Sequence, residues 1–157
     1  RLEKKRVSSE DQETFRRLAV ELRILEGTAE AIQARLNLVG AALTELNLAR
    51  MTLEGVEKET PDASLFVPIG GGSYVKAKLE STDRVIVGMG AGVSIEKTIT
   101  EAKATVQNRI SEFEKTRVSL QQQLVQVVSR IQENRNKLDE LAAKLSQAEK
   151  TTDVQET

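Results

Sequence analysis

The sequence predicts a mainly α-helical chain with a small β portion, built as a long antiparallel coiled coil whose two helices are joined by two β-hairpins. Three observations support this fold class. Apolar residues recur every seven residues through two long stretches, strand-like sequence with glycine-containing turns separates these stretches, and the 157 residues include only 3 Phe, 1 Tyr and no Trp. A sustained seven-residue repeat keeps one seam of a helix facing a partner helix, whereas a compact core normally contains more aromatic residues. We therefore expect a single elongated domain over residues 1–157.

The first helix is expected to span residues 9–54. Ser9 and Gln12 have the spacing of a capping box, which marks a helix start. Arg50 occupies a position in the apolar seam. Gly27 and Gly40 lie off the seam and are either tolerated, at about 1 kcal/mol each relative to alanine, or points of bending. The apolar seam residues are Phe15, Leu18, Leu22, Leu25, Ala29, Ile32, Leu36, Val39, Leu43, Leu46 and Leu53.

Residues 64–97 are expected to form two successive β-hairpins. Short runs rich in Val, Ile, Leu and aromatic residues are separated by Gly70-Gly71-Gly72, by residues 80–83 and by Gly90-Ala91. Glycine-containing segments of this length suit tight turns between antiparallel strands.

The first and third strands are apolar on both faces, because three apolar residues follow one another at positions 65–67 and again at 85–87. Such strands need cover on both sides, and two hairpins alone leave open edges. We expect the hairpins to join those of other chains in an intersubunit β-barrel or a packed double sheet; the alternative is a small private sheet on the helix ends. The expected assembly residues are Leu65, Phe66, Val67, Ile69, Tyr74, Val75, Val85, Ile86, Val87, Val93 and Ile95.

A second helix is expected over residues 98–148, starting at a capping box formed by Thr98 and Glu101. A polar, flexible tail is expected over residues 149–157. Polar residues interrupt the seam of this helix at Lys103, Arg117 and Asn134. Its apolar seam residues are Ile99, Val106, Ile110, Phe113, Leu120, Leu124, Val127, Ile131, Leu138, Leu141, Leu145 and Ala148.

The two helices are expected to lie antiparallel, because only a short block of compact hairpins joins them. This arrangement places Phe15 near residues 138–145 and Arg50 near Lys103. Buried cations without partners are costly, so we expect both cationic side chains to reach the solvent rim or acidic residues.

The composition argues against catalysis and against a metal centre. The chain has no Cys and no His, which removes thiolate nucleophiles, imidazole bases and the usual ligands of zinc, copper and haem. Gly88, Gly90 and Gly92 do not match a dinucleotide-binding fingerprint, because Val93 stands where the third glycine is required. We expect them to be turn and bulge glycines, and we expect no enzymatic activity, no cofactor and no metal.

The charge balance does not indicate a nucleic-acid-binding chain. Lys and Arg number 23 against 24 Asp and Glu, for a net charge of −1. The basic residues at positions 1–6 are expected to be a solvated terminus; binding to nucleic acid or anionic lipid is the alternative. No apolar run is long enough to span a bilayer and no secretory signal is recognised, so we expect a cytoplasmic location and no membrane partner.

The central sequence resembles that of the α-class subunits of prefoldin, most closely the archaeal form. The resemblance rests on residues 66–79 (FVPIGGGSYVKAKL), 85–93 (VIVGMGAGV) and 96–98 (EKT). It implies a heterohexamer of two α and four β subunits, whose hairpins form a double β-barrel from which six coiled coils extend. It also implies a chaperone that holds unfolded polypeptides at the coiled-coil tips without ATP and delivers them to a group II chaperonin. Two hairpins in one chain fit an α subunit, since β subunits of the family have one.

Client contact is expected near the tips of the helices that hold the chain termini. Val20 and Ile24 lie off the seam and widen its apolar stripe beyond what two helices can bury. The expected client-binding residues are Phe15, Leu18, Val20, Leu22, Ile24, Leu25, Leu141 and Leu145. Ordinary surface scatter is the alternative, because further off-seam apolar residues occur at Leu38, Leu48, Val118, Val125 and Val128. The alternative function is a structural coiled-coil adaptor or tether that binds one folded partner.

Overall fold

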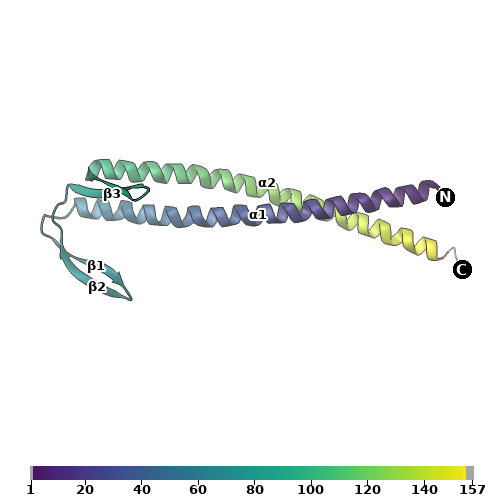
Figure 1. Cartoon of the computed structure of the whole chain (residues 1–157), viewed down its shortest axis with the longest axis horizontal. Coiled ribbons are helices and arrows are strands. Elements are labelled where there is room, and N and C mark those ends of the chain that lie inside the picture. The colour runs from purple at the N-terminus through teal and green to yellow at the C-terminus, as the bar shows by residue number, and fades with distance from the viewer. Residues whose placement is uncertain (1, 155–157) are drawn as a thin grey trace. The chain divides into compact units, whose positions relative to one another are not determined.

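The computed structural model describes residues 2–154, in which two long helices flank four short strands. The order along the chain is α1 (Leu2–Glu57), β1 (Ser64–Gly70), β2 (Ser73–Lys78), β3 (Arg84–Gly90), β4 (Val93–Thr98) and α2 (Ile99–Asp153) (Figure 1). The chain divides into two compact units, each of which contains part of both helices. We call residues 39–117 the hairpin unit, and residues 1–38 with 118–157 the termini unit. The fold class expected from the sequence is confirmed.

Both helices are longer than expected. α1 begins at Leu2, so the expected start near Ser9 is wrong, and it ends at Glu57 rather than at residue 54. Residues 2–8 contain no Gly or Pro, so nothing in them prevents the helix from continuing past a capping sequence. α2 runs to Asp153, so the expected flexible tail is wrong for residues 149–153, and residues 155–157 lie outside the described part of the chain.

The capping box at the start of α2 is confirmed. The backbone N–H of Glu101 donates to Thr98 Oγ1 at 3.2 Å, and the backbone N–H of Thr98 donates to Glu101 Oε2 at 3.2 Å. Two N–H groups that the helix leaves unpaired are satisfied in this way. The strand-to-helix junction is therefore defined by side chains only three residues apart.

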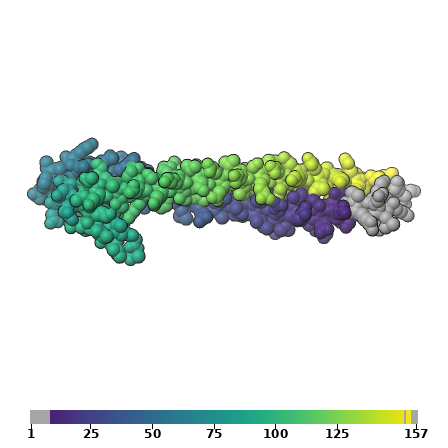
Figure 2. Space-filling model, turned by 90° about the horizontal axis from the view of Figure 1, so that it is seen from above, coloured from purple at the N-terminus to yellow at the C-terminus, as the bar shows by residue number. Residues whose placement is uncertain are grey.

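In the termini unit, ion pairs between α1 and α2 show that the helices are antiparallel. Arg130 Nη2 lies 2.6 Å from Glu21 Oε1, and Arg135 Nη2 lies 2.7 Å from Glu26 Oε1. Further along α2, Lys144 Nζ lies 2.9 Å from Asp11 Oδ2. Figure 2 shows the side chains of the two helices in contact along this unit. Exposed ion pairs contribute at most about 1 kcal/mol each, so the antiparallel register depends mainly on the apolar seam.

The hairpin unit has the same antiparallel register. Lys103 Nζ donates to Glu57 Oε2 at 2.8 Å, and Arg50 Nη1 donates to Gln107 Oε1 at 3.5 Å. Lys103 finds an acidic residue, as expected, whereas the partner of Arg50 is the neutral amide of Gln107. Neither cation is left unpaired inside the seam.

Burial follows the predicted seam in both units. Each fully buried Leu, Ile or Val contributes about 1.5–3 kcal/mol relative to an exposed position. The sequence did not indicate Ala102, which lies beside the seam position of Lys103 and is completely buried. The buried apolar helical residues are Leu18, Leu25 and Ile32 with Leu120 and Ile131 in the termini unit, and Val39 and Leu43 with Ile99, Ala102, Val106 and Ile110 in the hairpin unit.

Asn134 is the buried polar residue of the termini unit. Its side chain is 5% exposed, and its Nδ2 atom has no hydrogen-bond partner among the described residues. An unsatisfied buried amide costs about 1–3 kcal/mol. This position therefore weakens the seam locally.

Each hairpin is a separate two-stranded antiparallel sheet. β1 pairs with β2 and β3 pairs with β4, and both pairings shift register before the turn, between Pro68 and Gly70 and between Gly88 and Gly90. The turn residues have positive φ values, including 102° at Gly70 and 96° at Gly90, a region open to glycine. The interpretation of these glycines as turn and bulge residues is confirmed.

The second hairpin is fastened to α2. Arg109 Nη2 donates to the carbonyl oxygen of Gly88 at 2.7 Å, and the backbone N–H of Ile99 donates to the carbonyl oxygen of Asp83 at 2.8 Å. Val87 in β3 is 8% exposed. Among the described residues, no side-chain hydrogen bond or ion pair links β1 or β2 to either helix. The two hairpins are thus attached by different means.

We predict that Asn134→Leu stabilises the protein. Leucine is favoured in the seam, and the change removes an unsatisfied amide, so the free energy of unfolding should rise by about 1–3 kcal/mol. Urea unfolding followed by circular dichroism measures the change. Asn136→Leu is the control, because Asn136 is exposed and accepts a hydrogen bond from Gln132 at 3.0 Å. Equal effects of the two substitutions would contradict the conclusion that the buried amide of Asn134 destabilises the seam.

We also predict that Arg109→Ala loosens the second hairpin alone. Loss of the contact to the Gly88 carbonyl should speed hydrogen–deuterium exchange of the β3 and β4 amides and leave β1 and β2 unchanged. Arg130→Ala is the matched control, because Arg130 pairs with Glu21 in the termini unit. Unaltered exchange in β3 and β4 would show that Arg109 does not hold the hairpin.

Candidate functional site

The hairpins present an apolar surface to solvent. Phe66 and Ile86 are 65% and 76% exposed. The other exposed members of the expected assembly set are Val67, Ile69, Tyr74, Val75, Val93 and Ile95. Leu65 and Val85 are half-buried, and Val87 is buried. Most of the expected assembly surface is therefore available to another chain, although its role in assembly stays a prediction.

The two hairpins differ in which faces are open. In β3, Val85 and Val87 are covered while Ile86 between them is exposed, so one face of this strand is turned inward. In β1, both Phe66 and Val67 are exposed, although neighbouring residues of a strand point to opposite faces. Strand β1 is therefore exposed on both of its faces, whereas strand β3 is exposed on only one.

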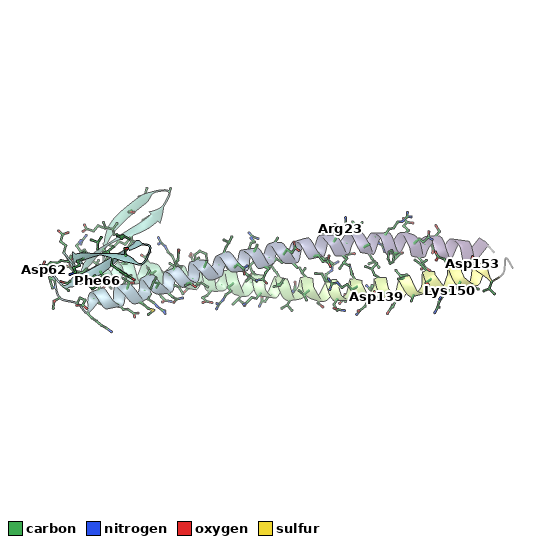
Figure 3. The ribbon with its side chains drawn as sticks, turned by 90° about the horizontal axis from the view of Figure 1, so that it is seen from below. Arg23, Asp62, Phe66, Asp139, Lys150 and Asp153 are labelled. Carbon is green, nitrogen blue, oxygen red and sulfur yellow. The ribbon has the colours of Figure 1, made fainter. Side chains whose placement is uncertain are left out.

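Aromatic packing stabilises the first hairpin internally. The rings of Phe66 and Tyr74 meet edge to face, with centroids 6.5 Å apart and an interplanar angle of 75°. Phe66 is labelled in Figure 3, which draws the side chains around the hairpins as sticks. Such a pair contributes about 0.5–1.5 kcal/mol beyond its buried area, so it favours the pairing of β1 with β2.

The strands do not combine into one four-stranded sheet within the chain. β1–β2 and β3–β4 remain separate sheets. The structure thus has two separate small sheets, rather than the one small private sheet on the helix ends that was the alternative. Within the described residues, the outer edges of both sheets have unpaired backbone groups, which are templates for strands from another chain.

The expected client-contact residues fall into two groups. Leu18 and Leu25 are buried in the seam, and Phe15, Leu22, Leu141 and Leu145 are half-buried. Val20 and Ile24 are 61% and 64% exposed. The seam members can touch another polypeptide only where the helices part, whereas Val20 and Ile24 are accessible on the paired helices.

Two charged groups near the hairpins, Lys103 and Asp83, have shifted pKa values. The hydrogen bond to Glu57 raises the pKa of Lys103 above its ordinary 10.5. A raised lysine pKa means that the pair's contribution is complete below pH 10.5 and is lost only as the pH rises through the raised value. The hydrogen bond with Ser81 lowers the pKa of Asp83. These exposed groups remain charged at neutral pH.

Neither a cluster of metal-ligating side chains nor a membrane-spanning helix is found in the described part of the chain. Within residues 2–154, no three His, Cys, Asp or Glu side chains are grouped so that they could hold a metal ion. Over the same residues, neither helix has an apolar segment of the length and hydropathy needed to cross a bilayer.

Comparison with known proteins identifies the family. The prefoldin family model, described as a prefoldin subunit, matches residues 25–153. The chain is 38% identical over 120 residues to prefoldin subunit alpha of Methanopyrus kandleri, which covers 76% of each chain. It is 30% identical over 139 residues to prefoldin subunit alpha of Pyrococcus horikoshii, which covers 88% of this chain and 94% of that one.

A solved structure shares the fold. A chain in the cryo-EM structure of filamentous PFD from Methanocaldococcus jannaschii superposes with a TM-score of 0.62 at 23% identity, covering 71% of this chain and 92% of that chain. The chain is therefore similar to archaeal prefoldin alpha subunits, and it belongs to the prefoldin family of chaperone subunits.

Proposed function

We propose that this chain is the α subunit of a hetero-oligomeric chaperone that holds unfolded polypeptides without ATP and delivers them to a group II chaperonin. The family is a chaperone family whose alpha subunits assemble with other prefoldin subunits. The observation that supports this function most directly is the pair of hairpins whose apolar residues are exposed. We further propose β-type prefoldin subunits as partners, two α chains with four β chains, a cytoplasmic location and no enzymatic activity.

The hairpins are proposed to be the assembly region. Burying Phe66 or Ile86 against another chain would contribute about 1.5–3 kcal/mol for each residue. Strand pairing at the open edges would satisfy the free backbone groups at the same time. Because the first hairpin is bare on both faces, a closed barrel formed with strands of other chains is the arrangement that covers it most completely.

The helices are proposed to hold clients near the chain termini. Val20 and Ile24 offer apolar area without a shaped pocket, which suits weak binding of many unfolded sequences. Leu141 and Leu145 are half-buried on the facing helix of the same unit. The unsatisfied amide of Asn134 weakens the seam in this unit, which would ease opening of the helices around a client.

We predict that Ile86→Asp prevents assembly. A carboxylate at a buried interface position loses its hydration without a partner, so native mass spectrometry of the chain co-expressed with a β-type subunit should show only unassembled species. The helical circular dichroism signal should be retained, because Ile86 is exposed in the single chain. If the variant assembles at the wild-type level, the face of β3 that carries Ile86 is not part of the interface.

We predict the reverse pattern for Ile24→Asp, which is the same substitution at an exposed helical position. Assembly should be unchanged, while the amount of complex needed to suppress aggregation of an unfolding client should rise several-fold. Wild-type suppression would show that Ile24 does not contact clients. If the wild-type complex itself fails to suppress aggregation and instead binds one folded protein saturably, the chain is a structural adaptor rather than a chaperone.

A further inference from the structure

α1 carries a second apolar seam on the side away from α2. Its members alternate spacings of four and three, as in a heptad repeat, and none is charged. The larger members, Val20, Ile24 and Leu38, are 61%, 64% and 73% exposed. The small residues between Ile24 and Leu38 are exposed as well. We call this set the outer seam: Val20, Ile24, Gly27, Ala31, Ala34 and Leu38. All six lie in the termini unit.

The facing helix provides an internal comparison. A helix in a two-stranded coil normally presents polar residues on its outer side. On α2, the corresponding outer positions between residues 119 and 136 follow this rule: Ser119, Gln122, Gln126, Ser129, Glu133 and Asn136. Exposed apolar residues of α2 in this unit, Val118, Val125 and Val128, lie at other positions. A continuous apolar row at the outer heptad positions is therefore found on α1 and is not matched on α2 over this stretch.

The middle of the outer seam is suited to close approach by another helix. Gly27, Ala31 and Ala34 have little or no side chain, and a Cβ atom placed on Gly27 would meet nothing within 4 Å. Small residues at such spacings let two helix backbones come together. Larger residues at both ends, Val20, Ile24 and Leu38, would close the interface above and below that point.

Charges beside the outer seam complement those of a second copy. In a parallel coiled coil, the residue just before each a position pairs with the residue five places further along on the partner helix. In the outer seam, the a positions are Ile24, Ala31 and Leu38. This rule pairs Glu30 with Arg35 of the second copy. The pair forms twice by symmetry and joins opposite charges. The rule also places Arg16 opposite Glu21 of the second copy, but Glu21 already pairs with Arg130 of its own chain at 2.6 Å. Glu30 and Arg35 have no ion-pair partner among the described residues of the single chain.

We propose that the outer seam binds the outer seam of a second copy of this chain, with the two α1 helices parallel and in register. The contact would extend over about 27 Å, from the rise of a helix between residues 20 and 38, and would be weak and reversible. Arg23 lies on the outer side of α1 (Figure 3), next to the seam, where it faces Thr28 of the second copy without repulsion. One consequence rests on the proposed function: if Ile24 also contacts clients, a second copy of the chain and an unfolded client would compete for the outer seam.

Disulfide formation tests this proposal, because the chain has no cysteine of its own. Gly27→Cys in the full chain should form a covalent dimer under mild oxidation several-fold faster than Ser129→Cys, its counterpart on the outer side of α2. Ala34→Glu should slow the dimerisation of Gly27→Cys several-fold. Ala143→Glu, at an exposed outer position of α2, should leave it unchanged.

Charge reversal tests the orientation in the same assay. Glu30→Arg and Arg35→Glu should each slow cross-linking of Gly27→Cys, and the double reversal should restore it, because opposite charges meet again only in the parallel arrangement. Equal rates for Gly27→Cys and Ser129→Cys would overturn the proposal. So would faster cross-linking of Val20→Cys to Leu38→Cys than of Val20→Cys to itself, which requires antiparallel helices. None of these readouts involves a client, so their failure leaves the proposed chaperone function standing.

Discussion

Mutual burial of one apolar seam by the two helices is the constraint on which the rest of this structure depends. α1 and α2 have 56 and 55 residues, and neither helix has a globular core to pack against. Most helical stability in proteins comes from packing of an apolar face rather than from intrinsic propensity. Each helix therefore supplies the other's core, and Leu43 or Ile110 stays buried only while both are present.

The polar interruptions of the seam show how this constraint differs between the two units. In the hairpin unit, Lys103 and Arg50 find Glu57 and Gln107, so the seam accommodates charge without an unpaired group. In the termini unit, Asn134 is buried with an unsatisfied Nδ2 atom. Polar seam residues specify register at a cost in stability. Here the uncompensated cost falls on the unit for which client holding is proposed.

The hairpins obey a different rule, because their apolar residues exceed what this chain can cover. The capping box of Thr98 and Glu101 and the contact from Arg109 to the Gly88 carbonyl orient the second hairpin with respect to α2. Beyond these contacts, Phe66 and Ile86 remain in solvent. A sheet with bare faces and open edges is marginally stable alone, which is the physical reason to seek its completion in other subunits.

Much of this architecture could be predicted from local patterns. The seven-residue repeat, the glycine turns and the spacing of Thr98 and Glu101 each act over a few residues, so they identified both helices, both hairpins and the cap. The end of α2 was harder to place, because a polar tail can continue a helix when nothing in it breaks one. Burial of Ala102 was also missed, since its position beside the seam is decided by how α1 and α2 approach each other.

The sequence by itself determined the helical seam, the strand pairs and their turns, because these depend on periodicity and on backbone preferences that single residues express. Only the tertiary structure decided which hairpin residues are accessible, because the sequence left β3 apolar on both faces. It covered Val87 and left Ile86 open. Exposure is a property of what packs against a residue, and that neighbour comes from a distant part of the chain.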